Sequence, residues 1–113
     1  MASTVAVNMR TCGKSHRITV SMRDDGDMDV SIESDCANVR EYAKALTRIS
    51  MSDIMDRRGS RILDPEASAP LSATCLTHSG VMSAAWMEAG MLSKSLCAKA
   101  GRNEVSFEPG APE

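Results

Sequence analysis

Aromatic residues are scarce in this chain of 113 residues, since Tyr42, Trp86 and Phe107 are the only ones. The core must therefore be filled mainly by smaller or more flexible side chains. Nine methionines are present, and the unbranched methionine side chain adapts well to irregular core volume. We expect methionine and alanine to occupy much of the space that phenylalanine and leucine usually fill.

The sequence also lacks an excess of either charge. Thirteen Lys and Arg residues oppose fifteen Asp and Glu residues, which leaves a formal net charge of −2. Such a balance provides no general electrostatic attraction for nucleic acid or for an anionic membrane surface. Neither is expected as a partner of this protein.

Long apolar runs are missing as well. No segment approaches the roughly 20 apolar residues that span a bilayer. The opening "MASTVAVNMR" has no basic stretch followed by a long apolar one, so no signal peptide is expected. These features favour a cytoplasmic location, where four cysteines would be reduced thiols or metal ligands rather than disulfides.

What the sequence does contain is enough for one folded domain. The chain length and an apolar fraction of 42% fit a single hydrophobic core. We expect residues 1–108 to form this domain and residues 109–113 to form a disordered tail.

Three segments alternate apolar and polar residues with a period of two, namely residues 4–10, 17–22 and 28–32. This period is typical of half-buried strands. The Asp25-Gly26 pair between the second and third segments favours a tight hairpin, because both residues tolerate positive φ. The pattern predicts a three-stranded antiparallel meander.

The period changes after Ser34 and Asp35, which are both good N-cap residues. Apolar side chains then recur at helical spacing from Cys36 to Leu46, with charged residues on the other side as far as Arg48, which predicts an amphipathic helix of about four turns. Ser50-Met51-Ser52-Asp53 resembles a capping box, so we expect a second, short helix that ends before Gly59.

A third helix is expected from around residues 74–77 to about Gly90, and its many apolar residues predict burial nearly all round. A further short helix is expected over residues 93–100, ended by Gly101. Val105 and Phe107 alternate with polar residues and indicate a fourth strand. The predicted fold is α+β, in the order β-β-β-α-α-α-β, with the helices packed on one face of the sheet.

The stretch "RTCGKSHRIT", residues 10–19, contains a Gly13-Lys14-Ser15 sequence like the end of a phosphate-binding loop. A P-loop needs a glycine separated from the Gly-Lys pair by four residues, and a helix after the pair. This chain has Asn8 upstream and a predicted strand downstream. The phosphate-loop interpretation is therefore rejected.

Three cysteines fall where predicted elements begin or end. Cys12 follows the first strand and Cys36 follows the third. In a meander these two strands run parallel, so their C-terminal ends should lie at the same edge of the sheet, about 10 Å from each other. Cys75 reaches the same edge if the third helix packs with its N-terminus there. Gly13 lets the Cys12 loop curl inward. We expect the three sulfur atoms within about 8 Å of each other, close enough for rotamer changes to form a tetrahedral site.

Thiolates suit zinc or an iron–sulfur cluster, and helix N-termini, where Cys36 and Cys75 are expected, favour the thiolate form. The predicted metal ligands are Cys12, Cys36, Cys75 and His78, with His16, Cys97 or an exogenous thiol or water as alternatives in the fourth position. The opposing interpretation is that each cysteine is an inert buried thiol, as is typical of a cysteine on an apolar helix face.

With "TCGKSHRITV", "VSIESDCANV" and "ATCLTHSGVMSAAWMEAGML" in place, the chain resembles a family of small uncharacterised three-cysteine proteins of methanogenic archaea and anaerobic bacteria. The resemblance covers most of residues 5–107 and implies that Cys12, Cys36 and Cys75 are the family's cysteine trio. The family typically has prolines just after the third cysteine, whereas this chain reads Leu76-Thr77-His78. No activity follows from the resemblance.

Three functions remain as hypotheses. The first is a metal-binding or iron–sulfur-binding module that uses the cysteine trio. The second is a thiol-based redox or sulfur-carrier protein, with Cys75 as the reactive thiol and His78 as its base. The third is a structural or partner-binding domain, such as a homodimer formed through the edge of the fourth strand. The sequence leaves open whether the protein is an enzyme.

Overall fold

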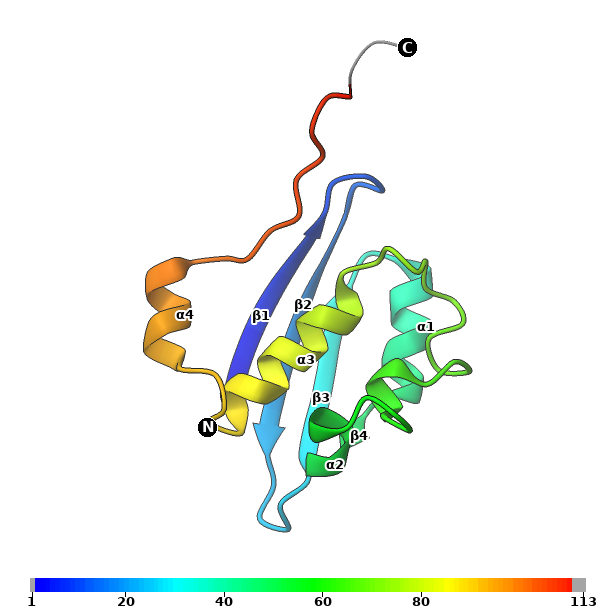
Figure 1. Cartoon of the computed structure of the whole chain (residues 1–113). Coiled ribbons are helices and arrows are strands. Elements are labelled where there is room, and N and C mark those ends of the chain that lie inside the picture. The colour runs from blue at the N-terminus through cyan, green and yellow to red at the C-terminus, as the bar shows by residue number, and fades with distance from the viewer. Residues whose placement is uncertain (1, 111–113) are drawn as a thin grey trace.

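The computed structural model of the protein describes residues 2–110 (Figure 1). Its elements are β1 (Ala2–Met9), β2 (Lys14–Met22), β3 (Met28–Ser34), α1 (Ala37–Ala45), β4 (Arg48–Ile49), α2 (Met51–Met55), the 3₁₀ turn η1 (Arg61–Leu63), α3 (Thr77–Glu88) and α4 (Lys94–Ala100). Residue 1 of the predicted domain and residues 111–113 of the predicted tail lie outside the described residues.

The predicted meander is confirmed. Strands β1, β2 and β3 pair antiparallel in chain order, with Val5 opposite Ile18 and Ile18 opposite Ile32. The turn between β2 and β3 is wider than the predicted tight hairpin, because it spans residues 23–27 and, of these described residues, only Gly26 has positive φ, at +91°; glycine adopts this conformation without strain. The C-terminal ends of β1 and β3 consequently lie at the same end of the sheet, as Figure 1 shows.

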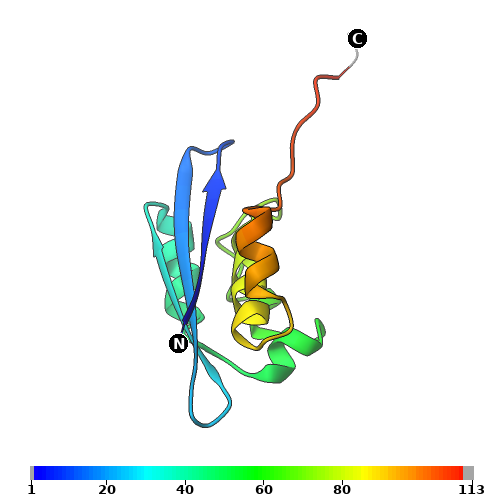
Figure 2. The same cartoon turned by 90° about the vertical axis from the view of Figure 1, so that its left-hand side faces the viewer.

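One face of the sheet carries the apolar side chains and is covered by helices. Helix α3 crosses β1 and β2, while α1 lies against β3. Figure 2 shows α3 and α4 together on one side of the β1–β2 hairpin. The core between sheet and helices consists mainly of aliphatic residues and the methionines Met9 and Met28, with Tyr42 as its one aromatic member. The other face of the sheet is polar and exposed.

The fourth strand is not the one that the sequence predicted. In the described residues, the sheet is completed by β4, which pairs with β3 through Met28 opposite Ile49. The predicted first helix is therefore shorter than four turns: it ends at Ala45, and Leu46 adopts φ −121° and ψ 73°. Burial of Ile49 against the sheet outweighs continuation of the helix, because a helical Ile49 would lose this core position.

The C-terminal segment forms no strand within the described residues. After Gly101, at φ +81°, the chain leaves the body of the molecule (Figure 1), and the side chains of Val105 and Phe107 are 69% and 81% exposed. Alternation alone does not make a strand, since the backbone also needs a neighbouring edge for its hydrogen bonds.

Helix α3 is buried on one side rather than nearly all round. Its buried residues are Thr77, Gly80, Val81, Ala84 and Ala85. Trp86, on the outer side, is 37% exposed, because a single layer of helices leaves one face of each helix to solvent. None of the described helices has both the length and the apolar character needed to cross a bilayer.

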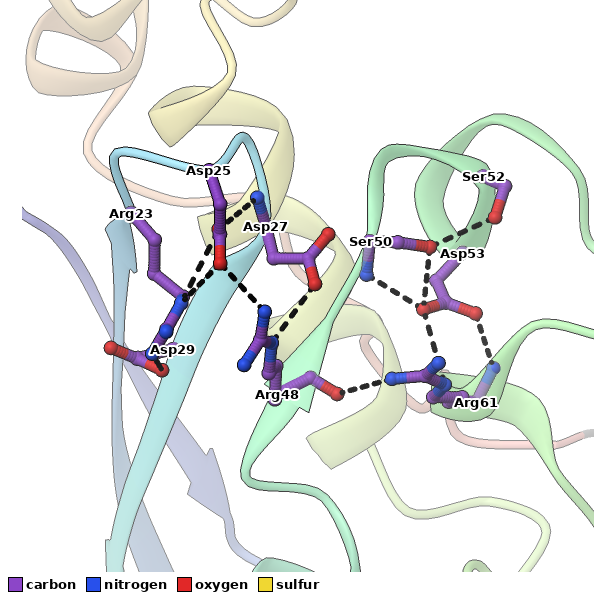
Figure 3. Close-up of polar contacts among 9 residues, drawn as sticks. All are labelled: Arg23, Asp25, Asp27, Asp29, Arg48, Ser50, Ser52, Asp53 and Arg61. Atoms are coloured by element: carbon purple, nitrogen blue, oxygen red, sulfur yellow. Dashed lines mark hydrogen bonds and ion pairs between the residues drawn. The ribbon is translucent and has the colours of Figure 1, made fainter.

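The capping box predicted for α2 is confirmed. The Asp53 carboxylate accepts hydrogen bonds from the Ser50 backbone at 2.8 Å and the Ser50 hydroxyl at 3.1 Å. Figure 3 shows this group beside a second one, in which Arg48 of β4 reaches across to the β2–β3 turn. Arg48 pairs with Asp25 at 2.7 Å and with Asp27 at 2.9 Å, so charged contacts fasten the short β4 to the hairpin.

Candidate functional site

A hollow of about 210 Å³ lies at the end of the sheet where β1 and β3 finish and where α1 and α3 begin. Cys12, Cys36 and Cys75 all line it, together with His16 and Met9. Its outer wall is the loop before α3, including Pro70 and Leu71. Three separate parts of the chain therefore bring their cysteines to one place.

Cys12 stands in the turn between β1 and β2. The turn is possible because Gly13 adopts φ +68°, a left-handed conformation that favours glycine. The Cys12 side chain is exposed, and its Sγ lies 3.7 Å from the Met9 carbonyl oxygen. This thiol is the most accessible of the three that line the hollow.

Cys36 is the N-cap residue of α1, in an extended conformation. Its backbone N–H donates to the Ser34 hydroxyl oxygen at 2.9 Å, while no side-chain hydrogen bond caps the helix. The thiol is half-buried. The start of α1 thus places this sulfur beside the positive end of the helix dipole.

Cys75 lies just before α3. Its backbone N–H donates to the Ser72 carbonyl at 3.0 Å, and its Sγ lies 3.1 Å from the Thr77 hydroxyl in the first turn of the helix. The Met9 thioether accepts a hydrogen bond from the neighbouring Leu76 N–H at 3.4 Å. Met9 therefore contacts both the Cys12 turn and the start of α3, and it ties the two sides of the hollow together.

His16 is the residue of the hollow whose environment is least expected from the sequence. It is only 4% exposed, and Nδ1 lies 2.7 Å from the Ser34 hydroxyl. Its Nε2 is the one buried side-chain nitrogen or oxygen in residues 2–110 that has no hydrogen-bond partner. Burial lowers the pKa of His16, outweighing the opposing influence of Asp35 and of the Ser15 backbone.

The signal that could have singled out His16 is its position on β2. It alternates in phase with Ile18 and Val20, which face the core, so the same pattern that predicts the strand places the imidazole on the buried side. The sequence interpretation began this strand at residue 17 and treated His16 only as an alternative ligand.

His78 and Cys97 do not line the hollow. His78 is half-buried on α3, its Nδ1 lies 3.2 Å from the Cys75 carbonyl, and its ring meets the Tyr42 ring edge-on at a centroid distance of 5.6 Å. Burial, and to a lesser extent the nearby Cys75, raises the pKa of Tyr42. Cys97 lies on α4, which contributes no residue to the hollow.

The ligating atoms are not assembled around a common centre in the conformation described. Across residues 2–110, no three side chains of His, Cys, Asp or Glu are grouped so that they could hold a metal ion as they stand. All four cysteines are free thiols. Metal binding at this hollow would require side-chain rotations, for which the exposed Cys12 turn offers the most freedom.

A second, wider hollow of about 420 Å³ lies between α2 and α3. It is lined by Trp86, two methionines and the arginine pair Arg57 and Arg58. It contains neither cysteine nor histidine, so it offers no soft metal ligand apart from thioethers. The thiol chemistry of the described chain is confined to the first hollow and to Cys97.

These features define a small α+β domain with a cysteine-lined hollow at one end of its sheet. The chain belongs to the family described as "Family of unknown function (DUF6951)", whose model matches residues 3–100. The match extends from the second residue of β1 to the last residue of α4 and includes every residue of the hollow. No curated protein and no solved structure matches the chain.

Proposed function

We propose that this protein binds a soft metal ion, or an iron–sulfur cluster, through the thiolates of Cys12, Cys36 and Cys75. The observation that supports this best is that three cysteines from three separate parts of the fold line one hollow. Chance burial of cysteine as a small apolar residue gives no reason for this meeting. Zinc and the iron of iron–sulfur clusters are the partners that such a donor set selects.

Three protein thiolates leave a fourth coordination position for another ligand. The sequence interpretation assigned it to His78, and that assignment stays a prediction, although His78 lies outside the lining of the hollow. An open fourth position on zinc supports exchange of ligands, delivery of the metal to a partner or binding of a substrate. A cytoplasmic location, where thiols stay reduced, and a cysteine trio shared by the whole family are part of the same proposal.

Metal analysis of the protein purified without oxygen tests the proposal. We expect about one equivalent of zinc, or iron with acid-labile sulfide, to be lost in Cys12→Ser, Cys36→Ser and Cys75→Ser. Cys97→Ser is the matched control, because it removes a thiol outside the hollow, and it should keep the metal. Fewer than about 0.2 equivalents in the wild type, unchanged by Cys12→Ser, would exclude metal binding.

A second candidate is thiol chemistry at Cys75, as in a redox protein or a sulfur carrier. The position of Cys75 just before α3, with its Sγ 3.1 Å from the Thr77 hydroxyl in the first turn of the helix, supports it, because reactive cysteines recur at helix N-termini. Cys36 or Cys12 would then resolve a disulfide formed at Cys75. Alkylation rates between pH 6 and pH 7 test this: Cys75 must react faster than a free thiol, and equal rates would exclude it.

A third candidate is association with a second copy through β1. This strand is at the margin of the sheet, and no described strand pairs with its outer edge, while the C-terminal segment exposes the apolar side chains of Val105 and Phe107. Residues 103–108 of one copy could add to β1 of another as an extra strand. Sedimentation of the full chain and of a chain ending at Gly101 tests this; if both are monomers at high concentration, the candidate is wrong.

A further inference from the structure

We propose that His16, through Nε2, is the fourth ligand, and that the metal is a single tetrahedral zinc ion held by Cys12, Cys36, Cys75 and His16. This inference rests on the proposed function, because it names the fourth ligand and the metal of the same hollow. It replaces His78, which the sequence analysis placed in the fourth position.

The first support is the unpartnered nitrogen of His16. A buried polar atom with no partner costs about 1–3 kcal/mol, and nearly all such atoms in folded proteins have one. Nε2 is buried without a partner although His16 lines the hollow. A metal ion bound there would use its lone pair and remove this cost.

The second support is the hydrogen bond at the other ring nitrogen. Nδ1 lies 2.7 Å from the Ser34 hydroxyl oxygen, and the same oxygen accepts the Cys36 N–H at 2.9 Å. When Nδ1 is the protonated nitrogen and donates to Ser34, Nε2 carries the free lone pair. Metal-bound histidines are typically oriented by such a hydrogen bond at the second nitrogen. The Ser34 hydroxyl oxygen therefore positions both the His16 imidazole and the Cys36 backbone through hydrogen bonds.

The third support is the contrast with His78. Its Nδ1 lies against the carbonyl of Cys75 and its ring packs against Tyr42, so this imidazole faces the core behind the hollow. Moving it into the hollow would break the contact with Tyr42, whose side chain is fully buried. His16 needs no such rearrangement.

The donor set also favours one metal ion over a cluster. Four-iron and two-iron clusters are usually held by four cysteines, whereas the fourth cysteine here, Cys97, lies on α4 outside the hollow. Three thiolates and one imidazole form a complete structural zinc site, with bonds of about 2.3 Å to sulfur and about 2.0 Å to nitrogen. Binding would require the cysteine side chains to rotate, because no such group is assembled in the described residues.

Cadmium-113 NMR on the wild-type protein tests the inference without any substitution. The reduced, metal-free protein is titrated with ¹¹³Cd²⁺, which replaces zinc in thiolate sites, and cadmium–proton couplings identify its ligands. We expect couplings to the β-protons of Cys12, Cys36 and Cys75 and to the ring protons of His16. Cadmium bound by the cysteines with coupling to His78, or to no histidine, overturns the inference and leaves the proposed function standing. No cadmium or zinc binding overturns both.

Zinc affinities of three variants, measured by competition with a chelator, supply an independent readout. We expect His16→Gln to weaken zinc binding by at least about 100-fold and Ser34→Ala by about 10-fold, since outer partners of ligating histidines typically contribute 10- to 100-fold. His78→Gln is the matched control and should change affinity by less than about 2-fold. Circular dichroism of each metal-free variant verifies the fold. Equal effects of His16→Gln and His78→Gln, or no effect of either, contradict the inference.

Discussion

Gly80 is the residue at which α3 comes closest to the sheet. A Cβ atom at this position would lie 2.7 Å from Val7 Cγ2 and 2.8 Å from Ile18 Cδ1. Both neighbours are core side chains, with exposures of 6% and 0%, so neither can move into solvent. The missing side chain of one glycine therefore sets the spacing between helix and sheet.

We expect Gly80→Ala to destabilise the protein by about 1–2 kcal/mol, because overpacking costs about 1–3 kcal/mol while alanine recovers up to about 1 kcal/mol of helix propensity. Urea unfolding measures the effect. Ser79→Ala, at an exposed position of the same helix, is the control and should be neutral or slightly stabilising. A Gly80→Ala variant as stable as the wild type would show that the core yields easily here.

Glu88, the last residue of α3, joins the helix to both strands of the β1–β2 hairpin. Its carboxylate accepts hydrogen bonds of 2.9 Å from the Ser3 hydroxyl and from the Met22 backbone N–H, and Lys94 lies 3.6 Å away. Burial by itself would raise the pKa of Glu88, but these hydrogen bonds and the lysine charge outweigh it and hold the pKa below its usual value.

Because the pKa of Glu88 is lower in the folded protein than its ordinary value of 4.5, ionised Glu88 stabilises the fold at pH values above about 4.5. This stabilisation is lost as the pH falls below about 4.5 towards the folded-state pKa. We expect Glu88→Gln to lose about 1–3 kcal/mol at pH 7, with a difference from the wild type that shrinks below pH 4.5. Urea unfolding at several pH values measures it, with exposed Glu66→Gln as the control; a constant difference down to pH 3 would contradict the assigned role.

At the scale of elements, Asp53 holds together parts that are too short to be stable alone. Helix α2 has five residues and η1 has three, whereas isolated helices shorter than about 12 residues are marginal in water. Besides capping α2, the Asp53 carboxylate accepts the Arg61 backbone N–H at 3.0 Å, and the Asp53 carbonyl accepts the Ser60 hydroxyl at 2.6 Å. Figure 3 shows the carboxylate between Ser50 and Arg61.

We expect Asp53→Asn to destabilise the protein by about 1–3 kcal/mol. One of the two carboxylate oxygens becomes an NH₂ group, which would face a backbone N–H instead of accepting its hydrogen bond. Asp56→Asn, at the exposed end of α2, makes the same chemical change and should cost less than half as much. Thermal unfolding monitored by circular dichroism distinguishes the two variants. Equal losses would mean that the carboxylate acts only through its charge.

At the scale of the whole molecule, the hollow joins three regions that are otherwise held by different contacts. Cys12 belongs to the β1–β2 turn, Cys36 to the start of α1 and Cys75 to the start of α3. A metal bound to all three would bind only the folded chain. Its binding free energy would then add to the free energy of unfolding.

We expect zinc at about 1,000 times its dissociation constant to add about 4 kcal/mol of stability, which for a domain of this size raises Tm by at least about 10 °C. Thermal melts with zinc and with a chelator measure the shift. Cys97→Ser should keep it and Cys75→Ser should lose it. A shift that survives in Cys75→Ser would indicate zinc bound elsewhere on the chain.

Local patterns were sufficient for much of the fold. Alternation predicted β1, β2 and β3, and Asp25-Gly26 predicted the turn between β2 and β3, although that turn spans five residues. Ser50 and Asp53 predicted the start of α2, and Gly101 predicted the end of α4. Each of these depends on residues within one turn or one strand. The fourth strand was predicted wrongly because pairing depends on a distant edge: β4 has only two residues, and its signal is the burial of Ile49 against Met28.

The sequence by itself determined the elements that short-range chemistry specifies, and the order of the meander, which places Cys12 and Cys36 at one end of the sheet. Only the tertiary structure decided that the start of α3 lies there too, so that Cys75 lines the same hollow. It also decided which histidine lines the hollow, because the packing of α3 over β2 leaves His16 buried while His78 turns towards Tyr42. The physical reason is that burial is a property of the packed layers, and no local spacing of residues encodes which side chain they will cover.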